Sequence, residues 1–254
     1  MSTPLYDDLD YDRMVNWQKR LSFELPFIEQ QLAANHARRI LDVACGSGQH
    51  AIALSQRGYE VTGVDQSPRM VERAQASATA AGVAGRFFVG SFGQLASQVG
   101  GTFDALLCLG NSLPHVLTDQ DLQSTLADFR AVLSPGGLLL IQNRNFDAVL
   151  AQQARWMSPQ SHHEPGQEWL FLRFYDFQPD GTLGFNVVTL QRGQGEAWQQ
   201  RVRATTLRPW RRDELVDMVT GAGFAPVQCY GDMAGAPFDG ASSANLIIVA
   251  QRAA

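Results

Sequence analysis

Short apolar runs alternate with helical patterns over the first 150 residues of the chain. Five runs have the length and composition of buried strands: 40–44, 59–64, 86–89, 103–109 and 138–142. Three stretches between them have the pattern of helices: 49–57, 67–81 and 119–133. Ser67-Pro68 is a typical helix start, and Gly58 is a typical helix stop. Strands that alternate with helices predict an α/β fold with a parallel sheet, which binds ligands at the carboxyl ends of its strands.

The pattern changes to a period of two in the second half of the chain. Three segments alternate apolar and polar positions: 169–177, 183–191 and 198–208. Asp180-Gly181 is a hairpin signal between the first two, so we predict a three-stranded antiparallel insertion within residues 160–208. One helix and two strands are expected after it: 211–222, 225–230 and 246–251. The main sheet then has seven strands, is mostly parallel with an antiparallel strand, and carries helices on both faces.

An amphipathic segment precedes the first strand. Its apolar residues recur at helical spacing: Leu21, Leu25, Ile28 and Leu32. Pro26 is expected to bend or restart this helix. Four side chains suited to covering a ligand come from the same segment: Tyr6, Tyr11, Trp17 and Arg20. We therefore interpret residues 1–38 as a helical cover on a main domain at 39–254, although a helix that only packs on the sheet is the simpler alternative.

Bulk composition excludes several classes of protein. The 254 residues are 45% apolar and 18% charged, which is ordinary for a globular protein. A formal net charge of -5 gives no sign of nucleic-acid binding, and we predict none. We see no signal peptide and no run of about 18 apolar residues, so we expect a cytoplasmic protein with no membrane partner. The oligomeric state is left open.

Cysteine and histidine spacing gives no metal site. The three cysteines, Cys45, Cys108 and Cys229, are far apart and odd in number. They fit a reducing compartment, and neither a disulfide framework nor a zinc site. His162-His163-Glu164 is a poor candidate as well, because no matching ligands stand at a sensible spacing. We predict no bound metal.

The turn after the first strand carries the most specific motif, Asp42-Val-Ala-Cys-Gly46-Ser-Gly48. Glycine lacks a Cβ, so Gly46 and Gly48 allow a tight turn close to a ligand. By pattern alone, the run from Gly46 to Ala51 also fits a dinucleotide fingerprint, with Asp65 near the position of a ribose-binding acid. Asp42 argues against NAD, because its carboxylate would repel a pyrophosphate and attract a sulfonium and an amino group.

These residues resemble motifs of class I S-adenosylmethionine-dependent methyltransferases. The first motif of that family is D-x-G-C-G-x-G, and Ala44 replaces its first glycine here. Asp65 after V-T-G-V is similar to the second, acidic motif. Three segments resemble the glycine and sarcosine N-methyltransferase branch: Gly110-Asn111-Ser112-x-x-His115, residues 137–147 (G-L-L-L-I-Q-N-R-N-F-D) and Trp17-x-x-Arg20. The resemblance implies a Rossmann-like methyltransferase fold and S-adenosylmethionine as the cofactor.

The resemblance also implies a set of cofactor contacts. Gly46-Ser47-Gly48 would pass under the methionine and ribose parts, Asp42 would lie near the amino group, and Asp65 would accept both ribose hydroxyls. Arg20 would pair with the cofactor carboxylate, a task suited to a guanidinium. The other implied contacts are Tyr11, Trp17, Ala44, Cys45, Gln66, Met70, Ser91, Phe92, Leu109 and Gly110. Simpler roles stay open, such as turn capping by Asp42 and Asp65 or core packing by Phe92.

The acceptor side is inferred in the same way. The candidate catalytic residues are His115, Asn111, Arg144 and Asn145. An arginine of the insertion (Arg173, Arg201 or Arg203) could bind an acceptor carboxylate, although alternating arginines on a sheet are more often solvated. No Ser-His-Asp or Cys-His set is recognisable, which fits an in-line methyl transfer that needs positioning and no covalent intermediate.

We therefore predict methyl transfer to a small molecule. The favoured acceptor atom is a nitrogen, in a glycine- or sarcosine-like amine or a heterocycle. The alternatives are O- or C-methylation of a small metabolite, an NAD-dependent oxidoreductase, and a subunit that binds the cofactor without catalysis. The insertion is expected to cover the acceptor.

Overall fold

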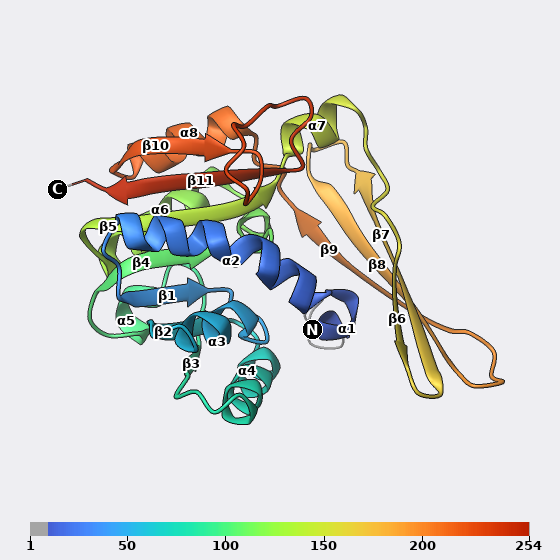
Figure 1. The fold of residues 1–254 in the computed structure, drawn as a ribbon. Coiled ribbons are helices and arrows are strands. Elements are labelled where there is room, and N and C mark those ends of the chain that lie inside the picture. Colours follow the sequence, from blue (N-terminus) through green and yellow to red (C-terminus); the bar gives the residue numbers. More distant parts are fainter. Residues whose placement is uncertain (1–9, 254) are drawn as a thin grey trace.

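The computed structural model describes residues 10–253, so Tyr6 of the predicted cover lies outside the described residues. Seven strands form the main sheet: β1 Arg39–Val43, β2 Glu60–Asp65, β3 Arg86–Val89, β4 Phe103–Cys108, β5 Leu133–Arg144, β10 Phe224–Tyr230 and β11 Asn245–Arg252. Their order is β10-β11-β5-β4-β1-β2-β3 (Figure 1). β11 is antiparallel to both neighbours, and β1 to β5 pair in parallel, which confirms the predicted sheet.

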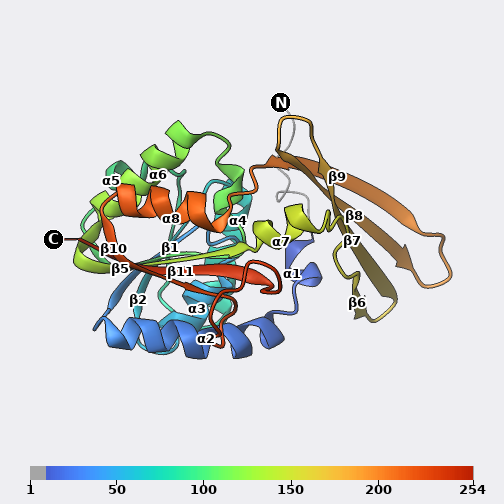
Figure 2. The same ribbon diagram turned by 90° about the horizontal axis from the view of Figure 1, so that it is seen from above.

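Helices cover both faces of this sheet, as predicted (Figure 2). One face is covered by α2 Trp17–Ala34, α3 Gln49–Ser55 and α4 Pro68–Ala80. The other is covered by α5 Leu95–Gln98, α6 Asp119–Val132 and α8 Arg212–Gly221. Side chains alternate along β5, so Leu138 and Leu140 pack toward α2 whereas Leu139 and Ile141 pack toward α6. α2 continues through Pro26, so the helix does not restart there.

The insertion has four strands, and the prediction of three was wrong. They are β6 Gln160–Glu164, β7 Gln167–Phe177, β8 Leu183–Gly193 and β9 Gln199–Leu207, in sheet order β6-β7-β8-β9. β6 is a short polar edge strand, Q-S-H-H-E, and it has no apolar alternation that a sequence pattern could reveal. The sheet lies beyond the carboxyl ends of the parallel strands (Figure 1).

Two short helices join this second sheet to the main domain. α1 Tyr11–Met14 places Met14 against Trp169 and Phe171 of β7. α7 Phe146–Ala151, which the sequence patterns did not reveal, packs against Tyr175 and Leu183. The alternation predicted over 169–177 is seen in β7, where Trp169, Phe171 and Tyr175 are buried. The start of the chain and the end of β5 are thereby held between the two sheets.

Candidate active site

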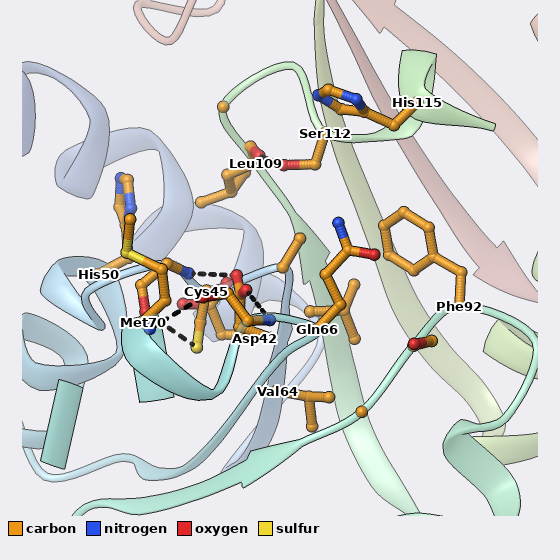
Figure 3. A pocket seen from close by; sticks show the side chains of 18 of the residues that line it. Asp42, Cys45, His50, Val64, Gln66, Met70, Phe92, Leu109, Ser112 and His115 are labelled. Carbon is orange, nitrogen blue, oxygen red and sulfur yellow. Dashed lines mark hydrogen bonds between the residues drawn. The ribbon is translucent and has the colours of Figure 1, made fainter. Parts of the chain in front are cut away.

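A cavity of about 260 Å³ opens where β1, β2 and β4 end (Figure 3). Most of the residues predicted for the site line it: Tyr11, Trp17, Arg20, Asp42, Ala44, Cys45, Gly46, Asp65, Gln66, Met70, Ser91, Phe92, Leu109, Gly110 and His115. The remaining lining residues were not predicted: Val43, His50, Val64, Ser67, Gly90, Leu95, Ser112 and Val116. Apart from His50 of α3 and Leu95 of α5, each directly precedes or follows a predicted residue in the sequence, which is the signal that could have found them.

Two residues of the glycine-rich turn lie outside the cavity. The hydroxyl of Ser47 donates to Asp12 Oδ1 at 2.5 Å, which ties the turn to α1. Gly48 has a φ of 79°, and a Cβ there would come within 2.9 Å of Ala74 and Phe87. Gly48 is therefore needed for close packing of α3 against α4 and β3.

The polar residues after β4 and β5 hold their own loops in place. Asn111 has a φ of 67°, and its side-chain oxygen accepts from the Arg144 N–H at 2.9 Å. Asn145 caps α7, and its Nδ2 donates to the carbonyls of Asp239, Gly240 and Ser243. None of Asn111, Arg144 and Asn145 lines the cavity. Asn111 belongs to the loop at 110–116, of which other residues line it, and Arg144 contacts this loop through Asn111.

Two carboxylates face the cavity from the ends of neighbouring strands. Asp65 accepts from the Gly46 N–H at 2.8 Å and from the Ser67 N–H at 2.9 Å, so its orientation is fixed by the backbone. Asp42 is 2% exposed. Burial raises the pKa of Asp42 to about 7, and the charge of Asp65 adds to the rise. A cationic ligand beside these two acids would relieve this repulsion, whereas a pyrophosphate would increase it.

Aromatic side chains from the start of the chain cover the cavity. The rings of Tyr11 and Trp17 meet edge to face at 5.8 Å between centroids, and Trp17 meets His50 in the same way at 5.7 Å. Trp17 Nε1 donates to Asp12 Oδ1 at 2.9 Å, the same atom that accepts from Ser47. α1 and the start of α2 are thereby fastened to the glycine-rich turn.

A buried ionic network supports this cover from behind. Arg20 lines the cavity and pairs with Glu24, which also contacts His50 and Gln142. Glu24 and Gln142 were not predicted from the sequence. The signal for Glu24 was its position within the apolar stripe of α2, three residues after Leu21 and four before Ile28.

The opposite edge of the cavity carries His115 and Ser112 (Figure 3). Both belong to the loop and 3-10 turn η1 Leu113–His115 that follow β4. Burial lowers the pKa of His115 to about 4, so its imidazole is neutral at physiological pH. A neutral imidazole accepts hydrogen bonds and does not repel a cation.

Beside this edge, the first sheet meets the insertion at Arg144, Arg173 and Tyr175. The Tyr175 hydroxyl is buried, and burial raises its pKa to about 12 although the charges of Arg144 and Arg173 oppose the rise. Neither this hydroxyl nor Arg144 Nε has a hydrogen-bond partner among residues 10–253. Buried polar atoms without partners are costly, so such a pair is a candidate contact for a ligand.

The other insertion arginines lie elsewhere. Arg201 and Arg203 line a second cavity of about 450 Å³. It is shared with Arg13 of α1 and with Arg69 and Arg73 of α4. Only Arg173, of the three insertion arginines considered, is therefore placed beside Tyr175.

Metal and membrane features were also sought within the described residues. No group of three or more His, Cys, Asp or Glu side chains there is arranged to hold a metal ion. His162 contacts Glu164 whereas His163 contacts Glu168, so the His-His-Glu run does not converge. Cys45, Cys108 and Cys229 are free thiols. In the same part of the chain, no helix has both the length and the apolar character that a membrane span requires.

The fold and the site together define an α/β protein that binds a nucleoside-like ligand at the carboxyl edge of its sheet. A family model described as a methyltransferase domain matches residues 40–137. The chain is 31% identical over 222 residues to a glycine/sarcosine N-methyltransferase of Aphanothece halophytica, covering 87% of this chain and 79% of that protein. The chain belongs to the family of S-adenosylmethionine-dependent methyltransferases.

Further comparisons agree with this assignment. A glycine/sarcosine/dimethylglycine N-methyltransferase of Actinopolyspora halophila is 29% identical over 223 residues, although the match spans only 37% of that longer protein. Among solved structures, an S-adenosylmethionine-bound amino pentose methyltransferase from Micromonospora echinaspora has a TM-score of 0.74 at 20% identity, with 99% of this chain and 98% of that chain covered. That likeness concerns the fold.

The cofactor is therefore S-adenosylmethionine, and the enzyme is a methyltransferase, as the motifs predicted. The NAD-dependent and non-catalytic alternatives are set aside. The side chains that line the cavity also fit this cofactor. Asp42 and Asp65 suit a sulfonium and an ammonium, and the guanidinium of Arg20 suits a carboxylate. The contacts of individual residues with the cofactor stay predictions.

Proposed function

We propose that the enzyme transfers a methyl group to the nitrogen of a small amine that carries a carboxylate, as glycine and sarcosine do. The names of the two N-methyltransferase relatives support a nitrogen acceptor. The observation that carries the proposal is the pair formed by Arg144 Nε and the Tyr175 hydroxyl. Both are buried at the acceptor edge, and neither has a hydrogen-bond partner in residues 10–253. A carboxylate would accept from both.

The position of this pair suits an acceptor that reaches into the cofactor cavity. The Arg144 N–H donates to Asn111, and the same loop continues to Ser112 and His115 in the cavity wall. A carboxylate held at Arg144 would leave the amine of a short molecule directed toward this wall. We further propose that α1 and α2 form the cover over the cofactor and that the insertion covers the acceptor.

The protein contributes positioning and exclusion of water to this reaction. When bound, the cofactor supplies an electrophilic methyl group on a sulfonium. Asp42 and Asp65 stabilise the charged ligand, while Trp17 and Tyr11 keep solvent out. His115 is neutral because of its lowered pKa, so it can accept a hydrogen bond from the amine and direct the nitrogen lone pair.

Nitrogen is favoured over oxygen or carbon on chemical grounds. A neutral amine attacks without first losing a proton, whereas a hydroxyl or a carbon acid requires a base. His115 lines the acceptor edge of the cavity, and with a pKa of about 4 it is a weak base.

A panel of acceptors assayed with radiolabelled methyl donor tests this proposal. Matched amines, alcohols and thiols would be compared, and the methylated atom identified by mass spectrometry. We expect label on nitrogen and none on oxygen or sulfur. Label on a hydroxyl or a carbon, with none on any amine, would reject the nitrogen acceptor.

A further inference from the structure

A network of buried side chains joins four elements behind the cofactor cavity. One Glu24 oxygen contacts Arg20 Nε at 3.0 Å and His50 Nε2 at 2.7 Å, and the other accepts from Gln142 Nε2 at 2.7 Å. Gln142 Oε1 accepts from Arg20 Nη2 at 3.1 Å and from the Gly110 N–H at 3.0 Å. Arg20, His50 and Gly110 line the cavity, whereas Glu24 and Gln142 lie behind them.

Charge fixes the direction of every hydrogen bond in this network. Burial alone would raise the pKa of Glu24, but the His50 hydrogen bond and the Arg20 charge outweigh it and hold that pKa at about 2. Glu24 is therefore ionised and can only accept. Gln142 must then turn its NH₂ group toward Glu24, which leaves its oxygen for Arg20 and Gly110.

Arg20 and Gly110, the two groups that contact the Gln142 oxygen, lie at one end of the cavity. A Cβ on Gly110 would come within 3.5 Å of Arg20 Nη2, so the guanidinium and the backbone of this loop adjoin each other. The Gly110 N–H already donates to Gln142, whereas the guanidinium has five N–H groups, more than its contacts with Glu24, Gln142 and Tyr11 use. The N–H groups that remain on Arg20 suit a carboxylate.

We propose that Glu24 and Gln142 are positioning residues for the cofactor, holding the Arg20 guanidinium and the loop at Gly110 where they meet its amino-acid end. Neither Glu24 nor Gln142 lines the cavity, so neither is placed to touch the ligand. This role concerns the cofactor only, and it holds for any methyl acceptor.

Alternatively, the network has a purely structural role and only supports the site as a whole. Binding of two ligands distinguishes this role from positioning of the cofactor. S-Adenosylhomocysteine carries the amino-acid end of the cofactor. 5′-Methylthioadenosine has the same adenine, ribose and thioether but lacks that end. Misplacing Arg20 and Gly110 should weaken only the first ligand, whereas a general loosening of the site should weaken both.

The test is E24Q, which keeps the shape of the side chain and removes its charge. The introduced NH₂ group replaces one of the two oxygens. On the side of Gln142 it meets that donor, so the Gln142 amide must turn its oxygen away from Arg20 and Gly110. On the other side it meets Arg20 Nε, which loses its acceptor. By calorimetry, we expect the Kd for S-adenosylhomocysteine to rise at least about tenfold and that for 5′-methylthioadenosine to stay within about twofold.

E29Q is the matched control. Glu29 lies on the same helix and pairs with Arg57 at 3.3 Å on the surface, so neither Kd should change. Unchanged binding of both ligands in E24Q, or equal weakening of both, overturns the proposal. If E24Q does not fold, Q142M decides: a loss confined to S-adenosylhomocysteine supports the positioning role, and no loss or an equal loss rejects it.

Discussion

The two ends of the active site differ in whether their polar groups find hydrogen-bond partners within the protein. At the cofactor end, Asp65, Glu24 and Gln142 are held by hydrogen bonds from the backbone or from one another. At the acceptor end, the buried Tyr175 hydroxyl and Arg144 Nε have no such partners in the described chain. The first end is organised by the fold before any ligand arrives, whereas the second leaves hydrogen-bonding capacity for the ligand to use.

This difference follows from what each end has to recognise. The cofactor is shared by the whole family, so its groups can be built into strand ends and turns. The acceptor differs between enzymes, and we propose that an inserted sheet contacts it here. Buried donors left open at such a site favour a ligand that satisfies them, because a ligand lacking the matching acceptor leaves them unpaired.

Replacing Arg144 should have the largest effect of the changes considered, and it should act on the acceptor end. R144M removes the guanidinium and keeps most of the stem, so loss of a buried charged contact to the acceptor should lower kcat/KM by roughly 100-fold. The Kd for S-adenosylhomocysteine should not change. R192M is the control, because Arg192 of the insertion is an exposed partner of Glu168 and should leave kcat/KM unaltered. Equal losses in the two variants would remove Arg144 from the acceptor site.

Replacing Asp65 should have the next largest effect, and it should act on the other end. D65A removes the acceptor of two ribose hydroxyls, so affinity for S-adenosylhomocysteine should fall roughly 30-fold while the protein stays folded. Asp104 is a matched control because it also accepts two backbone N–H groups, from Arg38 and Arg39 at 2.8 Å, away from the cavity. D104A should lower the Tm without changing affinity. Unaltered binding in D65A would refute the ribose contact.

The smallest effect is expected from pH. The pKa of Asp42 is raised from 3.8 to about 7 by burial and by Asp65, so the ligand-free enzyme loses stability as pH rises through 7 and this carboxyl ionises. A cationic ligand favours the ionised form. Affinity for S-adenosylmethionine should therefore rise up to about tenfold between about pH 6 and 8. In D42N, calorimetry should give a flat profile; a rise that persists in this variant would assign the pH dependence to another group.

Local patterns predicted most of the fold. The five strands before residue 145 and helices α3, α4 and α6 follow from apolar runs and from Gly and Ser-Pro signals. The four-residue helix α5 between β3 and β4 was not predicted. Strand β6 and helix α7 were also missed, because a five-residue polar edge and a six-residue helix carry too little pattern. Their formation depends on pairing with β7 and on packing against Tyr175.

The site was predictable where it coincides with strand ends and was not where it depends on tertiary contacts. Asp42, Asp65 and Gly46 follow strands and reach the cavity for that reason. Gly48 belongs to the same motif, yet its contacts are with Ala74 and Phe87. Gln142 could not be found from its position on β5, since its role comes from α2 and the loop after β4.

The most direct test of the central claim compares glycine and sarcosine with their amides as acceptors of labelled methyl groups. The amides keep the amine and replace the carboxylate by a neutral carboxamide. The carboxamide also lowers the pKa of the amine, which by itself would favour the amides. If Arg144 and Tyr175 bind that carboxylate, kcat/KM for the acids should exceed that for the amides by at least about 100-fold. Equal rates for the acids and their amides would contradict the claim.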